Sequence, residues 1–282
     1  MKLILVEGIP GSGKTTACGY IEKQLEDQGN RTKVYLEGDL DHPADFEATA
    51  FVSADQLGGL SIKFPELKEK KSFQQYKGTQ AGVLIPYYKL SHAGELTSEC
   101  TAELSKYDVY EMPPELYKEL ILNRWSTFVE KVRAEDFIVV TDCCFMQNPL
   151  TMLMAKYNES CHSIKKFISE IEEVIRELNP LVIYLEPVSI KEVIENVKMQ
   201  RSPEWFKHVS SYYTKQEYGK AHSLPEGLEG VVQLLEDRAG LEKQLLSLLK
   251  IKHAVIPVSV QDRRTEEMLA ESLIAAFGSL EG

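Results

Sequence analysis

Near its start the chain carries a loop whose residue types are suited to binding phosphate. The stretch from Gly8 to Thr15 reads GIPGSGKT and fills every fixed position of the pattern G-x-x-x-x-G-K-[ST]. Small residues let backbone N–H groups close around phosphate oxygens, and the following helix adds the positive end of its dipole. Lys14 can reach the outer phosphates of a nucleotide, and the Thr15 hydroxyl can ligate Mg²⁺. The residues expected to bind the phosphates of a nucleotide are Gly8, Ile9, Pro10, Gly11, Ser12, Gly13, Lys14, Thr15 and Thr16.

Three carboxylates stand at the ends of predicted strands. Glu37 and Asp39 end the second strand, and Asp142 ends the third. Because ligands bind at the carboxyl ends of parallel strands, all three are expected beside the phosphate loop. Transfer of a phosphoryl group needs a carboxylate that orients the acceptor hydroxyl and takes its proton. Glu37 and Asp39 are the candidates, and Asp39 is slightly favoured because a loop can aim it.

Two of these carboxylates, Asp39 and Asp142, also have a structural alternative. Asp39 could serve a turn or a helix cap, because aspartate often bonds to nearby backbone N–H groups. Asp142 is placed to support Mg²⁺, usually through water, and its alternative is a capping role. Thr15 and Asp142 are therefore the predicted metal residues.

Two arginines are candidates for binding the negative charge of a phosphate. Arg201 follows the helix after the fourth predicted strand, and we expect the segment 200–225 to be a lid that brings Arg201 over the transferred group. Arg124 is a candidate for binding an acceptor phosphate, and a surface ion pair is its alternative. Asp39 and Arg124 are thus the predicted acceptor-binding residues.

Short apolar runs without alternation predict strands that are covered on both faces. The five predicted strands are Lys2–Val6, Thr32–Glu37, Asp136–Thr141, Leu181–Leu185 and His253–Val258. The helices predicted by apolar residues at helical spacing are Thr15–Leu25, Glu115–Val132, Ile164–Leu178, Ser189–Met199, Leu228–Leu249 and Arg264–Phe277. Strands that alternate with helices indicate an α/β fold, here the P-loop NTPase fold: a five-stranded parallel sheet with helices on both faces.

The second and third predicted strands are separated by a connection much longer than one crossover needs. We expect residues 43–133 to form a helical insertion that covers the site and shapes the acceptor pocket. A structural addition remote from the chemistry is the alternative. The lysine-rich run 68–71 is expected to be a solvated helix face. The chain 1–282 as a whole is expected to form a single domain with this insertion.

The composition restricts the classes of partner. A net charge of −11 argues against a general surface for nucleic acid or anionic membranes. The five cysteines are odd in number and contain no C-x-x-C pair, which argues against zinc and a disulfide framework. No apolar run approaches the length of a membrane span, and the first strand begins at once, which leaves no room for a signal peptide. We therefore expect a cytoplasmic protein without membrane or nucleic-acid partners, and a homodimer is left open.

The segment Ile4–Thr16 resembles the opening of thymidylate kinases and deoxynucleoside kinases, which carry a Glu-Gly pair at the start of the loop. Asp142 stands where these kinases have an acidic residue, although Cys143 follows it in place of their usual arginine. Glu37 is similar to their strand-end glutamate, although Gly38 replaces the usual proline. The segment Leu181–Pro187, with its helix and Arg201, is similar to their strand, helix and lid, but the usual pair of lid arginines is incomplete.

The order of elements matches these kinases across much of the chain, whereas the specific motifs are concentrated in the first sixteen residues. The resemblance implies an ATP-dependent kinase of small molecules and does not identify the acceptor. Small-molecule kinases that resemble chloramphenicol phosphotransferase also use an aspartate after the second strand, as Asp39 could be.

These observations predict a Mg²⁺-dependent phosphotransferase that moves the γ-phosphoryl group of ATP to a small molecule. The acceptor would be a nucleoside, a nucleotide or another hydroxyl compound. The predicted catalytic residues are Lys14, Glu37, Asp39 and Arg201. Two alternatives stay open: a P-loop NTPase that acts as a switch, and a nucleotide-binding module that has lost catalysis.

Overall fold

The structure is a computed structural model that describes residues 1–68, 73–259 and 264–278. It divides into two compact units. The first comprises Met1–Glu37 and Ser126–Gly282, and the second comprises Gly38–Trp125. The segment expected as an insertion, 43–133, overlaps this second unit, which begins at residue 38 and ends at residue 125. Residues 69–71 of the lysine-rich run lie outside the described residues.

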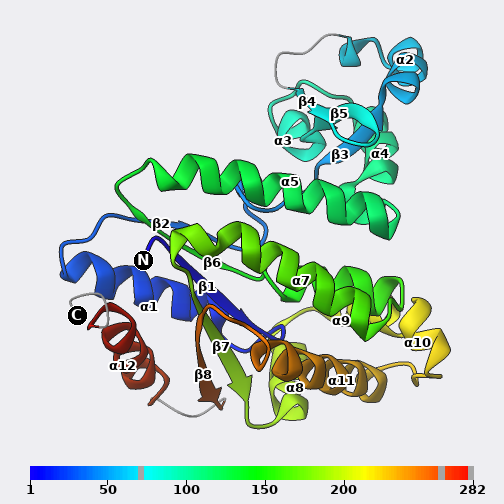
Figure 1. Ribbon diagram of the computed structural model, residues 1–282. Coiled ribbons are helices and arrows are strands. Elements are labelled where there is room, and N and C mark those ends of the chain that lie inside the picture. The colour runs from blue at the N-terminus through cyan, green and yellow to red at the C-terminus, as the bar shows by residue number, and fades with distance from the viewer. Residues whose placement is uncertain (69–72, 260–263, 279–282) are drawn as a thin grey trace. The chain divides into compact units, whose positions relative to one another are not determined.

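A five-stranded parallel sheet forms the centre of the first unit, in the order β2–β6–β1–β7–β8 (Figure 1). Its strands are β1 (Leu3–Gly8), β2 (Thr32–Tyr35), β6 (Ile138–Asp142), β7 (Leu181–Pro187) and β8 (Lys252–Val258). The three inner strands β1, β6 and β7 are almost entirely buried, which explains why their sequences are apolar without alternation. The five predicted strands are confirmed, and β1 lies at the middle of the sheet.

Helices cover both faces of this sheet (Figure 1). The helices of the first unit are α1 (Lys14–Asp27), α6 (Gln147–Leu150), α7 (Cys161–Ile175), α8 (Ile190–Gln200), α9 (Pro203–Thr214), α10 (Glu217–Ala221), α11 (Leu228–Leu246) and α12 (Arg264–Gly278). Helices α1 and α12 share one core with the strands, in which Ile4 and Val6 meet Ile21 and Leu273. Helices α8, α9 and α11 share a second core. With the loop between β1 and α1, this is the α/β fold of the P-loop NTPases, as predicted.

The second unit is not purely helical, so the prediction of a helical insertion was wrong on this point. It contains a three-stranded antiparallel sheet in the order β3–β5–β4. Its elements are β3 (Ala50–Ser53), α2 (Ala54–Lys63), β4 (Gln74–Lys77), β5 (Ala81–Ile85), α3 (Tyr87–His92), α4 (Ser98–Leu104) and the first part of α5 (Pro114–Arg133). The strands are four or five residues long. Such short runs show no clear period, and pairing between β3 and β5 is what creates the sheet.

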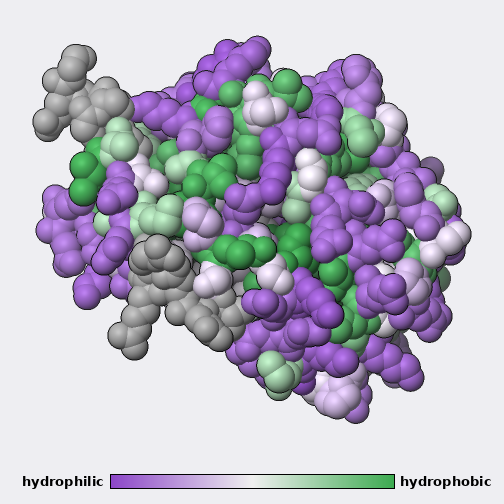
Figure 2. Space-filling model, turned by 90° about the horizontal axis from the view of Figure 1, so that it is seen from below, coloured by the Kyte–Doolittle hydropathy of each residue, from purple (hydrophilic) through white to green (hydrophobic). Residues whose placement is uncertain are grey.

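The surface is largely hydrophilic on the face shown in Figure 2. Figure 2 shows hydrophilic residues over most of one face, with hydrophobic residues between them. Large apolar side chains with high exposure, such as Ile62, Val188 and Met199, are separated along the chain. Among the described helices, none combines the length and hydropathy that crossing a membrane requires.

Candidate active site

The loop between β1 and α1 is shaped by glycines that no other residue replaces without strain. Gly8 and Gly11 both have positive φ angles, 145° and 83°. A Cβ atom on Gly8 would lie 2.7 Å from the Leu185 carbonyl oxygen, and one on Gly11 would overlap the Val197 side chain. The backbone of the loop therefore follows a path that depends on the absence of side chains at these two positions.

The N-terminus of α1 points its free N–H groups into the loop. Gly13 is the N-cap residue, with φ 92°, and no side chain caps the helix. The first N–H groups of a helix have no acceptor within it, and the dipole adds positive potential there. The Ser12 hydroxyl is also buried, and it has no hydrogen-bond partner among the described residues. These donors form a concave site for an anion.

Lys14 is held across the same loop by backbone carbonyl groups. Its ammonium donates to the carbonyl oxygens of Ile9 at 2.9 Å and Gly8 at 3.3 Å. The side chain is only 6% exposed. An ammonium has three N–H donors, so one is left for a ligand. The charge is thus fixed in place before any phosphate binds.

A cavity of about 620 Å³ opens beside the loop, so the loop is not closed by its own side chains. The predicted site residues that line it are Pro10, Gly11, Gly13, Lys14, Thr15, Thr16, Glu37, Asp142 and Arg201. Side chains of α8, α9 and α11 complete the wall, among them Val197, Trp205 and Leu235. The volume lies in the range of small-molecule sites.

Asp142 lies at the carboxyl end of β6 and faces Thr15. The Thr15 hydroxyl donates to Asp142 Oδ2 at 3.5 Å, and the Glu37 N–H donates to Asp142 Oδ1 at 2.8 Å. Burial raises the pKa of Asp142, while the Glu37 N–H and the Lys14 charge oppose that rise. A hydroxyl and a carboxylate are oxygen ligands of the kind that Mg²⁺ prefers. Among the described residues, no three His, Cys, Asp or Glu side chains are arranged to hold a metal ion by themselves. A Mg²⁺ ion shared with phosphates needs only one or two protein ligands.

Glu37 lies two residues beyond the end of β2 and lines the same cavity. Its carboxylate accepts hydrogen bonds from Gln147 Nε2 at 3.0 Å and from Cys143 Sγ at 3.3 Å. Gln147 comes from the short helix α6 after β6, and the sequence analysis did not single it out. These two donors hold an otherwise exposed carboxylate in one orientation.

Asp39 and Arg124 belong to the second unit, where each makes hydrogen bonds with neighbouring residues. The Asp39 carboxylate accepts the Asp41 N–H at 2.9 Å, which is the turn role weighed for it. Arg124 donates to the carbonyl oxygens of His42 at 2.7 Å and Asp45 at 3.1 Å. The surface ion pair weighed for Arg124 is absent from the described part of the chain.

Arg201 is exposed and follows the last residue of α8. Its guanidinium lies 5.8 Å from the centre of the Trp205 ring, and both side chains line the cavity beside the phosphate loop. The segment 200–225 contains α9 and α10, so it is largely helical.

A buried network behind the loop was missed by the sequence analysis. Arg238 of α11 is fully buried and donates to Glu242 Oε1 at 2.8 Å, to Thr151 Oγ1 at 3.3 Å and to the Gly8 carbonyl oxygen at 3.3 Å. Glu242 also accepts the Tyr184 hydroxyl at 2.6 Å. The signal was present, because an arginine and a glutamate four residues apart interrupt a leucine-rich stripe.

Glu7 is a second buried carboxylate next to the loop. Its two oxygens accept the N–H groups of Phe145 at 2.8 Å and Gln147 at 2.9 Å, which ties β1 to the segment after β6. Burial raises the pKa of Glu7 to about 7, and the two backbone hydrogen bonds limit the rise. The charged form is therefore disfavoured by folding around neutral pH.

This shift predicts a dependence of stability on pH. The unfolded Glu7 loses its proton near its ordinary pKa of 4.5, whereas the folded one keeps it until about pH 7. The stability that Glu7 contributes is complete below pH 4.5 and falls by about 3 kcal/mol as pH rises through 7. Urea unfolding of the wild type and of Glu7→Gln between pH 4.5 and 8 measures how the free energy of unfolding changes with pH, and the wild type should lose more stability over this range than Glu7→Gln. Glu135→Gln, an exposed control, should keep the wild-type slope, and an unchanged slope in Glu7→Gln would contradict the assignment.

No protein-family model matches the chain, and no curated protein matches it in sequence. Among solved structures it is similar to the deoxyadenosine kinase from M. mycoides with bound dATP, at 15% sequence identity and a TM-score of 0.43. The match covers 97% of this chain and 99% of that chain. A likeness at this level concerns only the general arrangement of the chain, so activity and substrate must be argued from the residues of the site.

Proposed function

We propose that the protein is a phosphotransferase that moves the γ-phosphoryl group of ATP to a hydroxyl of a small molecule. One observation carries the proposal. The loop residues Gly11, Gly13 and Lys14 line a single cavity together with the polar residues Thr15, Glu37, Asp142 and Arg201. Phosphoryl transfer is catalysed mainly by positioning and by stabilisation of charge, and these are the groups it requires.

On this proposal the loop N–H groups and Lys14 bind the donor phosphates. Lys14 is already held by two carbonyl oxygens, so binding a phosphate requires little reorganisation. Arg201 follows the last turn of α8 and adds a second cation at the rim of the cavity. Closure of the segment 200–225 would bring this charge to the group being transferred.

Glu37 is the better supported candidate for orienting the acceptor hydroxyl and taking its proton. It lines the cavity with Lys14, and its bonds to Gln147 and Cys143 fix its direction. Asp39 already accepts the Asp41 N–H, which leaves one carboxylate oxygen for an acceptor. Asp39 and Arg124 belong to the second unit, and the acceptor-binding role expected for them stays a prediction.

Thr15 and Asp142 would hold Mg²⁺, which when bound neutralises charge on the β- and γ-phosphate oxygens. Asp142→Asn is expected to raise the Mg²⁺ concentration for half-maximal activity about 10–100-fold. Asparagine keeps an oxygen that accepts the Glu37 N–H, so the fold should persist. Mg²⁺ titration at fixed ATP measures the effect. Asp136→Asn, which changes an exposed aspartate two residues before the same strand, is the control, and equal Mg²⁺ requirements in both variants would contradict the role.

The test of the function is direct. Purified protein is incubated with γ-labelled ATP, Mg²⁺ and nucleosides, nucleotides, sugars or aminocyclitols, and transfer of label to the acceptor is measured. A labelled acceptor supports the proposal. Release of inorganic phosphate without a labelled acceptor would favour an NTPase switch. Binding of ATP without turnover would favour a module that has lost catalysis, and no binding of ATP at all would overturn the assignment of the loop.

A further inference from the structure

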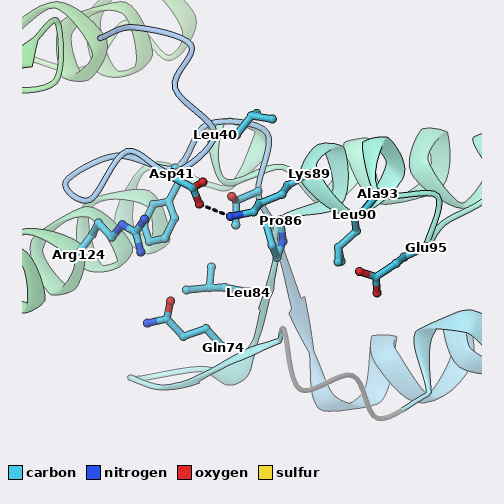
Figure 3. Close-up of a pocket in the computed structure, with 12 residues that line it drawn as sticks. Leu40, Asp41, Gln74, Leu84, Pro86, Lys89, Leu90, Ala93, Glu95 and Arg124 are labelled. Atoms are coloured by element: carbon cyan, nitrogen blue, oxygen red, sulfur yellow. Dashed lines mark hydrogen bonds and ion pairs between the residues drawn. The ribbon is translucent and has the colours of Figure 1, made fainter. Parts of the chain in front are cut away.

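The second unit has a cavity of its own that the proposed phosphoryl transfer leaves unexplained. It encloses about 440 Å³ (Figure 3). The lining residues come from the segment before β3, from β4 and β5, from α3 and the residues next to it, including Glu95, and from Arg124 on α5, and all belong to the unit Gly38–Trp125. The volume is that of a site for a small molecule rather than a packing defect.

One part of the wall is apolar. Leu84 lies on β5, and Pro86 and Leu90 follow at the start and within α3. Phe46 adds an aromatic ring at the side of Arg124. A ligand that covers this wall would bury apolar surface at about 25 cal/mol per Å², which favours a compact or flat organic body.

Arg124 supplies a positive charge at the edge of that wall. The half-buried guanidinium donates one N–H to the Asp45 carbonyl oxygen and one to the His42 carbonyl oxygen, and it lies 4.9 Å from the centre of the Phe46 ring. A guanidinium has five N–H donors. The groups in direct contact with it are two carbonyl oxygens and an aromatic ring, the carboxylates of Asp45 and Asp41 lie nearby, and among the described residues Arg124 makes no ion pair.

The charged residues that line the cavity are two cations, Lys89 and Arg124, and two carboxylates, Asp41 and Glu95. Burial lowers the pKa of Arg124, and the nearby carboxylates of Asp45 and Asp41 oppose this effect without a direct ion pair. Asp41 is engaged by Lys89, the pair joined by a dashed line in Figure 3. A partly desolvated guanidinium with donors to spare binds a carboxylate or a phosphate more strongly than it binds neutral groups.

We propose that this cavity binds a small organic anion, with its apolar body on Leu84, Pro86 and Leu90 and its carboxylate or phosphate on Arg124. The binding uses only groups of the second unit. It therefore goes beyond the proposed phosphoryl transfer and does not depend on the phosphate loop.

The experiment uses the whole protein without ATP and two fluorescent probes that differ in charge. The anionic probe is 8-anilinonaphthalene-1-sulfonate, and the neutral one is N-phenyl-1-naphthylamine. The wild type should bind the anion saturably. Arg124→Gln should weaken binding of the anionic probe about tenfold and binding of the neutral probe less than about twofold, because only the sulfonate loses a charged partner. Arg133→Gln, on the same helix outside the cavity, should bind both as the wild type does.

A second variant keeps the test decisive if Arg124→Gln folds poorly. Ala93 lines the cavity and is exposed, so Ala93→Trp can block the cavity without changing the core. It should abolish saturable binding of both probes, with an unchanged circular dichroism spectrum.

Displacement of the anionic probe identifies the group that is recognised. Benzoate and phenyl phosphate should displace the anionic probe, whereas the neutral benzyl alcohol should not. The more effective of the two anions shows whether the site prefers a carboxylate or a phosphate. The proposal would be overturned if benzyl alcohol competed as well as the anions, if both probes responded equally to Arg124→Gln, or if Ala93→Trp left binding intact. Absence of saturable binding to the wild type would overturn it too.

Discussion

Replacement of Lys14 by alanine is expected to lower the rate of phosphoryl transfer by about 10²–10³-fold while the chain stays folded. The expectation rests on the position of the ammonium, which the carbonyl groups of Gly8 and Ile9 hold over the loop. A charge that is already in place stabilises the transition state without reorganisation. The measurement is transfer of label from ATP, together with the melting temperature of each variant.

Matched variants separate this role from a structural one. Lys23→Ala removes an exposed lysine from the same helix and should leave the rate unchanged. Lys14→Arg keeps the charge but changes the shape of the donor, so it should restore binding of ATP better than it restores the rate. If Lys14→Ala transfers phosphate at the wild-type rate, the loop does not serve the chemistry.

Arg238→Met is expected to lower the free energy of unfolding by about 3–5 kcal/mol, the largest effect on stability that we predict. The variant leaves the Glu242 carboxylate buried without its cation and removes a donor from the Gly8 carbonyl. Burial alone would lower the pKa of Arg238, but Glu242 and its neighbours raise it, so the arginine stays charged. Urea unfolding at neutral pH measures the loss.

The double variant Arg238→Met/Glu242→Leu tests the cause. Removing both charges should recover most of the lost stability, because the cost comes from the unpaired carboxylate. Arg176→Met breaks an exposed pair with Glu173 and should cost no more than about 1 kcal/mol. A double variant as unstable as Arg238→Met would instead assign the loss to packing of α11.

The phosphate loop was predictable because its residues are contiguous. Glycines that permit positive φ, a lysine and a threonine at fixed spacing specify a strand, a turn and a helix within a few residues. The five strands were predictable for a related reason, since burial on both faces makes each an apolar run. The end of β2 was predicted two residues late, at Glu37 instead of Tyr35, because a polar residue beyond a strand carries no signal for where pairing stops.

The surroundings of the loop were less predictable because they depend on residues far apart in the chain. Gln147 reaches Glu37 across 110 positions, and Arg238 reaches Gly8 across 230. Neither pair has a local pattern. The antiparallel sheet of the second unit was missed for the same reason, because its paired strands β3 and β5 are separated in the chain by α2 and β4. Pairing between distant segments depends on how they pack together, and the spacing of apolar residues within one segment does not reveal it.

The amino-acid sequence by itself determined the phosphate loop, the apolar strands and the acidic strand ends, because each is written in neighbouring residues. Only the tertiary structure decided that Thr15 lies against Asp142, that Glu37 is held by Gln147 and Cys143, and that Arg124 lines a separate cavity. The reason is physical: a side chain's chemistry depends on its partners and its burial, and the fold sets both by bringing distant residues together.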